Sequence, residues 1–226
     1  MHRRTWLLLP AGVSLLAGLD AALLLLEVPA PVDAAHLPTA HGILMVLGFL
    51  GTLISLERAV ALRSPWAYAA PALLGAGGVM LAAGPRLLGQ VLLIDGLVAF
   101  LAIAVLLGRR QGDGATAVEV LAVSQALAAA ILWTRLEVSA LLPLLVGFVV
   151  WTIAAERVEL ARLTLGRGAD HRLLVLAAVY AAGSATALLS PAIGSRLAAL
   201  TLVALCAWLP RHDVARHTIR SRGLPR

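Results

Sequence analysis

The sequence has no lysine, a single cysteine and few charged residues of any kind. Only 13% of the 226 residues are charged while 61% are hydrophobic, and the mean hydropathy is +0.93. A soluble domain cannot bury so much apolar surface, whereas lipid can solvate it. The lone Cys206 excludes an intramolecular disulfide and a CxxC metal or redox motif.

Motifs of soluble enzymes are also missing. There is no P-loop, no GxGxxG after a strand, no GxSxG and no HExxH. These absences disfavour an enzyme, but the sequence leaves the question open.

Apolar segments of about 20 residues, each long enough to cross a hydrocarbon core, recur along the whole chain. They predict an all-α, polytopic membrane bundle that occupies residues 1–210 and precedes a basic tail at 211–226. The first segment continues to Leu26, too long for a signal peptide, so we take it as a retained helix. The eight predicted transmembrane helices are 5–27, 38–62, 66–84, 87–108, 115–134, 139–163, 172–190 and 193–209.

The arginines predict the orientation of these helices. Fifteen of the 18 fall on one side of the predicted membrane, and only Arg86, Arg135 and Arg196 fall on the other. By the positive-inside rule both termini are expected in the cytoplasm. The basic tail would attract anionic lipid headgroups, so we expect the bilayer, and not nucleic acid, as its partner.

Part of the sequence repeats after 99 residues. Segment 47–63 aligns with 146–162, and a Gly-Phe and a Glu-Arg pair coincide in the two segments. This pattern predicts parallel repeats of four helices each, approximately 5–108 and 115–209, related by an axis along the membrane normal. The same offset pairs Asp20 with Glu119.

The repeated Glu-Arg pairs are candidates for ion pairs between the repeats. Neighbouring residues of a helix point about 100° apart, so Glu57 cannot fold back onto Arg58. A pseudo-twofold axis would instead join Glu57 to Arg157 and Glu156 to Arg58. The alternative is that all four side chains end their helices and snorkel to the interface.

Three other polar residues, Asp20, Asp95 and Gln125, lie well inside predicted spans. An ionised carboxylate there costs about 2.5–3.5 kcal/mol unless it is paired, hydrated or protonated. Asp20 and Asp95 lie at a similar depth, which is compatible with a shared site or a proton path. They can equally be protonated or hydrogen-bonded carboxyls that hold helices together. Glu119 lies close to the inner face, where we expect it to be solvated.

Two histidines mark the start of the second span. His36 falls on the preceding loop and His41 in the first turn of the helix, with Met45 one turn further on. The three can supply nitrogen and sulfur ligands to copper, or His41 can be a structural hydrogen-bonder. A stripe of small or polar residues that can accept a flat porphyrin or a closely packed helix follows on the same face: His41, Met45, Gly48, Thr52 and Ser55.

The residues Thr39, His41, Gly42 and Met45 resemble the second helix of haem-copper oxidase subunit I, where the histidine is an axial haem ligand. The sequence is also similar to the NnrS family, bacterial polytopic membrane proteins associated with haem, copper and nitric oxide stress. The resemblance implies haem or copper at His41, with His36 and Met45 nearby, in the bacterial inner membrane. Those families have about twelve helices, so the eight predicted here suggest a shortened member.

The sequence therefore leaves three alternative functions, of which the first is our leading hypothesis. The first is an NnrS-like role in metal or nitric oxide homeostasis, with haem or copper bound near the outer face. The second is a small-solute or proton-coupled transporter that uses Asp20 and Asp95. The third is a non-catalytic membrane subunit or assembly factor that packs against partner proteins or further copies of itself.

Overall fold

The computed structural model describes residues 3–160 and 168–212, and these fold into helices with no strand among them. Most of the predicted tail, 211–226, lies outside the described residues. In chain order the elements are η1 (Arg3–Leu7), α1 (Leu8–Leu25), α2 (Leu37–Ile43), η2 (Leu44–Gly51), α3 (Thr52–Leu62), η3 (Pro65–Tyr68), α4 (Ala69–Ala83), α5 (Arg86–Gln111), α6 (Gly114–Leu132), α7 (Val138–Leu160), α8 (Gly168–Leu189) and α9 (Pro191–His212).

Within the described residues, eight helical segments are long and apolar enough to cross a membrane, which agrees with the predicted number. Turn residues set their ends much as the sequence indicates. The α5 helix stops where Gly112 adopts a left-handed conformation (φ 66°), and α6 starts where the Asp113 carboxylate accepts the Thr116 backbone N–H at 2.9 Å. The chain thus has the helix content of a multi-pass membrane protein.

The second predicted span is not one uniform α-helix. A π-helical segment, η2, separates α2 from α3 and contains Gly48 and Gly51. The hydroxyl of Thr52 donates to the Gly48 carbonyl at 2.6 Å and supports the transition back to α-helix. The π-helix is rare in proteins, and where it occurs it is often part of a functional site.

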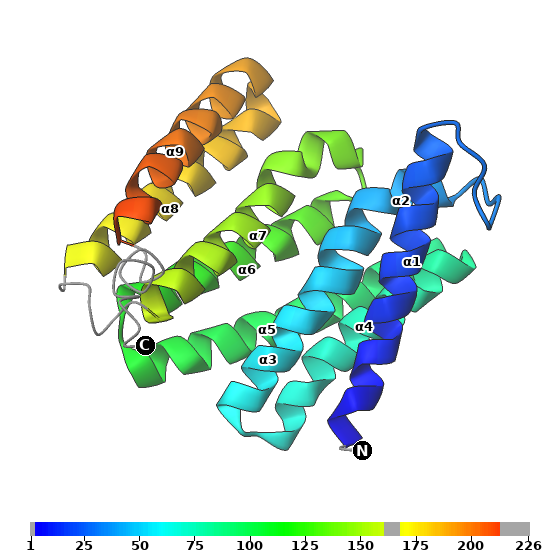
Figure 1. The fold of residues 1–226 in the computed structure, drawn as a ribbon, viewed down its shortest axis with the longest axis horizontal. Coiled ribbons are helices and arrows are strands. Elements are labelled where there is room, and N and C mark those ends of the chain that lie inside the picture. The colour runs from blue at the N-terminus through cyan, green and yellow to red at the C-terminus, as the bar shows by residue number, and fades with distance from the viewer. Residues whose placement is uncertain (1–2, 161–167, 213–226) are drawn as a thin grey trace, which may run out of the picture.

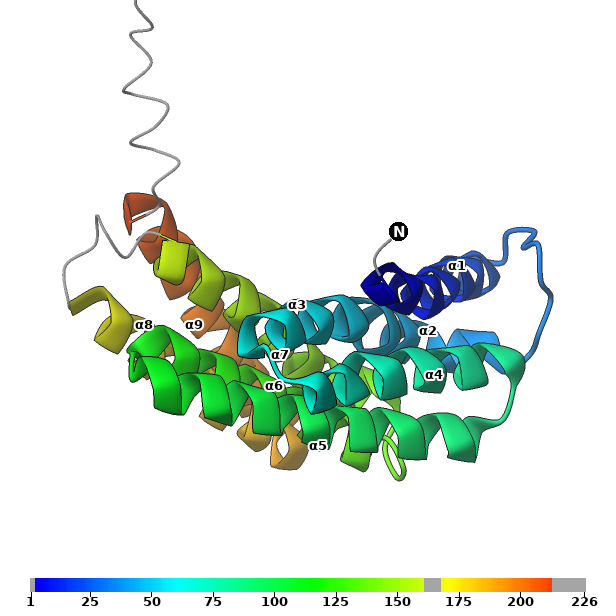
Figure 2. The ribbon, with the colours of Figure 1, turned by 90° about the horizontal axis from the view of Figure 1, so that it is seen from below.

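The helices lie side by side, with α1 at one edge of the molecule and the α8–α9 pair at the other (Figures 1 and 2). Between them, α4 packs on α5, α5 on α6, and α6 on α7. The α1 helix packs on α4 as α6 packs on α8, an arrangement that a duplication would produce. The duplication itself stays a prediction.

One part of the predicted repeat does not hold at the first helices. Asp20 lies five residues before the end of α1, whereas Glu119 lies five residues after the start of α6. The two carboxylates therefore lie near opposite ends of their helices and are not equivalent positions.

Glycines allow α1, η2 and α4 to approach closely. A Cβ at Gly48 would lie 2.9 Å from the Ser14 hydroxyl and 3.4 Å from the Gly78 backbone, and a Cβ at Gly78 would collide with the same hydroxyl. Small residues allow this close approach and are typical of contacts between membrane helices.

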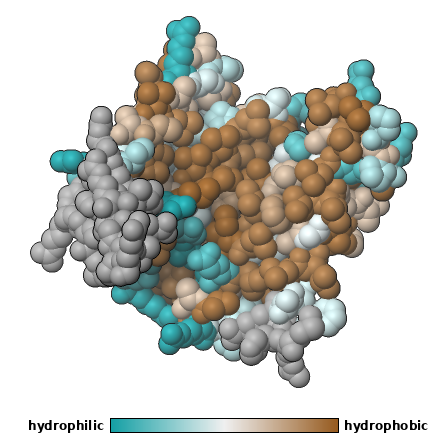
Figure 3. All heavy atoms as spheres, viewed as in Figure 1, coloured by the Kyte–Doolittle hydropathy of each residue, from teal (hydrophilic) through white to brown (hydrophobic). Residues whose placement is uncertain are grey.

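The outer surface is strongly apolar. Brown, hydrophobic residues cover most of the face in Figure 3, and teal, hydrophilic residues collect mainly around its margin. Large side chains such as Leu16 (68% exposed) on α1 and Leu200 (67% exposed) on α9 have no cover from the described chain. Such a surface is suited to lipid or to partner helices and not to water.

Candidate functional site

Arg58, near the end of α3, contacts three carboxylates from two other helices. Its Nε lies 2.7 Å from Oε1 of Glu119 on α6. Its two terminal nitrogens lie 3.0 Å from Oε1 of Glu156 and 3.6 Å from Oε2 of Glu159, both on α7. We call these four residues the Arg58 centre.

The centre has a buried part and an accessible part. The Arg58 and Glu119 side chains are 9% and 3% exposed, whereas Glu156 and Glu159 are 32% and 33% exposed. The Arg58–Glu119 contact is an ion pair without hydrogen-bond geometry, because neither Nε nor Oε1 has a hydrogen-bond partner. Arg58 donates a hydrogen bond to Glu156. The four groups thus connect the interior of the bundle to its surface.

Helix ends explain why these side chains meet. Arg58 lies four residues before the end of α3 and Glu156 four before the end of α7, while Glu119 is five residues into α6. At 1.5 Å per residue each lies about 6–8 Å inside its helix end. Because α6 runs opposite to α3 and α7, all three groups reach the same end of the bundle.

The centre has more negative than positive groups. One guanidinium faces three carboxylates, so the four residues would carry a net charge of −2 if all were ionised. Like charges at short distance in a poorly hydrated site disfavour one another strongly. Uptake of a proton or of a cation would reduce this excess of negative charge.

The structure brings together one of the two pairs expected between the repeats. Arg58 bonds to Glu156, as described above, but Glu57 and Arg157 are both exposed and no ion pair joins them in the described part of the chain. Each helix turns its side chain outward, one position along the chain from the inward-facing Arg58 or Glu156.

Two members of the centre were not expected there from the sequence. Glu119 is 2% exposed, so the expectation that it is solvated is wrong. Its carboxylate contacts Arg58, which reaches across from α3. Glu159 was overlooked, although its spacing of three residues from Glu156 places both on one face of α7.

His36 and His41 contact different helices. The Nδ1 of His41 lies 2.8 Å from the Gly18 carbonyl of α1, and the Nε2 of His36 lies 3.2 Å from the Ala82 carbonyl of α4. A carbonyl oxygen only accepts, so each of these ring nitrogens carries the proton. The side chain of Met45 also packs against Gly18, since a Cβ added to Gly18 would lie 2.6 Å from the Met45 sulfur.

These contacts bear on the proposed ligands. His41 and Met45 both lie against Gly18 of α1, whereas His36 contacts α4. The described residues contain no group of three His, Cys, Asp or Glu that can hold a metal ion. The stripe that begins at His41 packs against α1 and α4. Each histidine keeps one ring nitrogen as a potential ligand, Nε2 in His41 and Nδ1 in His36.

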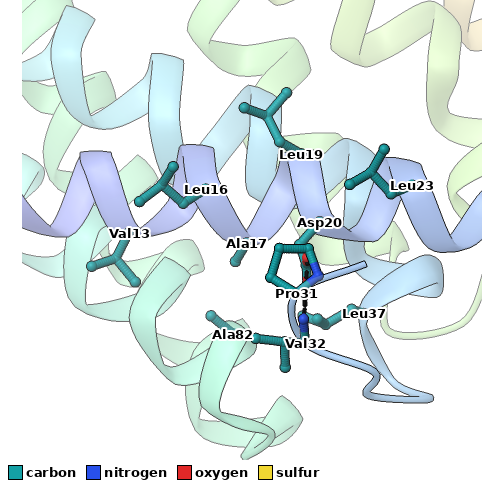
Figure 4. Close-up of a pocket in the computed structure, with 10 residues that line it drawn as sticks. All are labelled: Val13, Leu16, Ala17, Leu19, Asp20, Leu23, Pro31, Val32, Leu37 and Ala82. Carbon is teal, nitrogen blue, oxygen red and sulfur yellow. Dashed lines mark hydrogen bonds between the residues drawn. The ribbon is translucent and has the colours of Figure 1, made fainter. Parts of the chain in front are cut away.

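Asp20 and Asp95 lie in different surroundings. Both carboxylate oxygens of Asp20 accept the backbone N–H of Val32, at 3.2 and 3.3 Å, and so tie the loop after α1 back onto the helix. Figure 4 shows this contact at the wall of an apolar cavity of about 490 Å³. Asp95 is exposed on α5, and no hydrogen bond or ion pair joins the two within the described chain.

Gln125, the third polar residue expected inside a span, is buried in the middle of α6 at 4% exposure. Its amide faces α7 and α8, because a Cβ at Gly147 would collide with its Oε1.

Comparison with known proteins identifies a family but no activity. Residues 4–226 match the family described as a domain of unknown function, DUF8744. The chain belongs to this family. Comparison with curated proteins and with solved structures finds no match. Any function of this DUF8744 protein therefore has to be argued from the arrangement of its own residues.

Proposed function

We propose that this DUF8744 protein is a membrane-embedded, proton-coupled transporter and that the Arg58 centre is its proton-exchange site. The observation that carries the proposal is the cluster of three carboxylates around one buried guanidinium. Ionisable groups inside membrane helices are rare and often mark ion or proton pathways.

The arrangement suits proton exchange because the carboxylates differ in access. Glu156 and Glu159 are each about one-third exposed and can exchange protons with water at the surface. Glu119 is almost fully buried and meets them through Arg58. A proton taken up at the accessible carboxylates can therefore neutralise the excess charge beside the buried one.

A purely structural ion-pair cluster is the alternative. It explains the contact of Arg58 with Glu119 and Glu156 but gives no reason for a third carboxylate. One carboxylate balances the charge of one guanidinium, whereas here three carboxylates repel one another around a single guanidinium.

Proton flux into proteoliposomes tests the proposal. We would reconstitute the protein with an internal pH-sensitive dye and impose a membrane potential. We expect flux above that of protein-free vesicles, lost in Glu119→Gln and kept in Glu57→Gln, which alters an exposed carboxylate beside the centre. Absence of flux in the wild type, or equal flux in Glu119→Gln, would contradict the proposal.

A second candidate function is haem or copper binding at His41, as the NnrS resemblance implies. One observation favours it. Metal-ligating histidines commonly donate their other ring N–H to a carbonyl or carboxylate, and Nδ1 of His41 donates to Gly18. The test is the absorption spectrum and copper content of the purified protein. Signals that His41→Ala removes support the function, and their absence from the wild type contradicts it.

A further inference from the structure

Two polar side chains in the middle of the bundle have no hydrogen-bond partner within the part of the chain that the structure describes. Neither the amide nitrogen nor the amide oxygen of Gln125 is bonded, and the indole Nε1 of Trp151 is not bonded either. Gln125 is 4% exposed and Trp151 is fully buried. Each residue lies near the midpoint of its helix, α6 or α7, far from water at either end.

The Gln125 and Trp151 side chains lie where α6, α7 and α8 pack together. A Cβ at Gly147 would lie 2.8 Å from the Tyr180 ring and would collide with the Gln125 amide oxygen, so both side chains border the same glycine. Trp151 lies one turn further along α7, and its ring centroid is 5.7 Å from that of Tyr180.

The same region contains a further polar contact. Pro143 interrupts the backbone hydrogen bonding of α7, and its carbonyl accepts the Tyr180 hydroxyl at 2.8 Å and the Ser184 hydroxyl at 3.4 Å. Polar groups of α6, α7 and α8 therefore occur along the stretch of α7 from Pro143 to Trp151, about 12 Å of its length, in an otherwise apolar core.

We propose that bound water occupies this region and hydrogen-bonds to the Gln125 amide and the Trp151 indole. A buried amide without partners is strongly unfavourable where bulk water is absent. A buried water molecule typically makes about three hydrogen bonds. The Gln125 amide offers donors and an acceptor and the indole offers one donor, a set that water complements.

Water at this position would also have a role in proton transfer, and this part of the inference rests on the proposed function. Gln125 lies six residues beyond Glu119 on α6, or about 9 Å deeper in the bundle. Water there can extend a proton path from the Arg58 centre. In each transfer a water molecule accepts one proton and releases another, so one O–H bond forms while another breaks and the water molecule is regenerated.

Hydroxyl-radical labelling in an X-ray beam tests whether the region is wet, because radicals form from water next to the modified side chain. We expect Trp151 and Tyr180 to be oxidised. Phe100 and Phe148 are the internal control, since they are also fully buried but pack edge to face at 6.3 Å in an apolar setting. Rates are normalised to those of the unfolded chain. Protection of all four side chains would overturn the proposal.

The Tm of a Gln125→Met variant distinguishes a hydrated site from a dry one. If water is bound, the substitution removes its partners, so labelling of Trp151 falls and Tm does not rise. If the site is dry, the substitution relieves an unpartnered amide and raises Tm by roughly 2–4 °C per kcal/mol gained. The matched control is Gln90→Met, the same change at a buried glutamine of α5.

Proton flux then distinguishes this inference from the proposed function. Loss of flux in Glu119→Gln with unchanged flux in Gln125→Met would leave the Arg58 centre intact and remove the water from the path. Labelling of Trp151 in a protein without proton flux would support the bound water and contradict the proposed function.

Discussion

Adjacent residues can have opposite roles in this protein, as Glu57 and Arg58 demonstrate. Both are charged and both belong to a pattern that recurs after 99 residues. The helix turns Arg58 inward onto Glu119 and leaves Glu57 exposed. Their spacing predicts that the two side chains point in different directions. Which of them is buried depends on the helices that pack against α3.

The first prediction concerns this contrast. Arg58→Met leaves three carboxylates without their cation, so the free energy of unfolding in detergent should fall by about 3–5 kcal/mol. Glu57→Gln changes an exposed residue without a partner in the centre and should stay within about 0.5 kcal/mol of the wild type. Thermal or denaturant unfolding measures both, and equal effects would contradict the burial of Arg58.

The second prediction concerns Asp20. Its carboxylate holds the loop after α1 through the Val32 N–H, so Asp20→Ala should lose about 1–3 kcal/mol of stability. Hydrogen exchange at Val32 should rise with it. Asp95→Ala removes an exposed carboxylate of α5 and serves as the control. Unchanged exchange at Val32 would show that Asp20 does not hold the loop.

At the scale of helices, the sequence predicts lengths well and contacts poorly. The predicted span 87–108 and the observed α5, Arg86–Gln111, agree because length and apolar composition fix a membrane helix. The π-helical η2 was not predicted, since Gly48 and Gly51 alone do not distinguish it from α-helix. The stripe from His41 had two interpretations, a porphyrin site or a closely packed helix, and the fold shows α1 and α4 packed against it.

The third prediction tests that close packing. Gly78→Ala should destabilise the protein, because the new Cβ collides with the Ser14 hydroxyl. Overpacking of this kind typically costs about 1–3 kcal/mol. Adding Ser14→Ala should recover part of the loss.

Gly12→Ala is the matched control for this prediction. Nothing lies within 4 Å of its Cβ position, so it should be neutral or stabilising, by up to about 1 kcal/mol. A Gly78→Ala protein as stable as Gly12→Ala would show that α1 and α4 are not closely packed.

At the scale of the whole molecule, the bundle separates an apolar exterior from a few buried polar groups. The candidate site was only partly predictable, because it needs residues from three helices at the same end. The repeat pointed to Arg58 and Glu156, but nothing local to Glu119 shows that a guanidinium from α3 reaches it. Ligand geometry at His41 likewise depends on where α1 lies.

The central claim is that the Arg58 centre holds an exchangeable proton. Infrared spectroscopy of the wild type and of Glu119→Gln in lipid tests it most directly. We predict a band of a protonated carboxylic acid at neutral pH that shifts in D₂O and changes in the variant, while Glu57→Gln leaves it unaltered. A spectrum without such a band, or one that Glu119→Gln does not affect, would contradict proton exchange at the Arg58 centre.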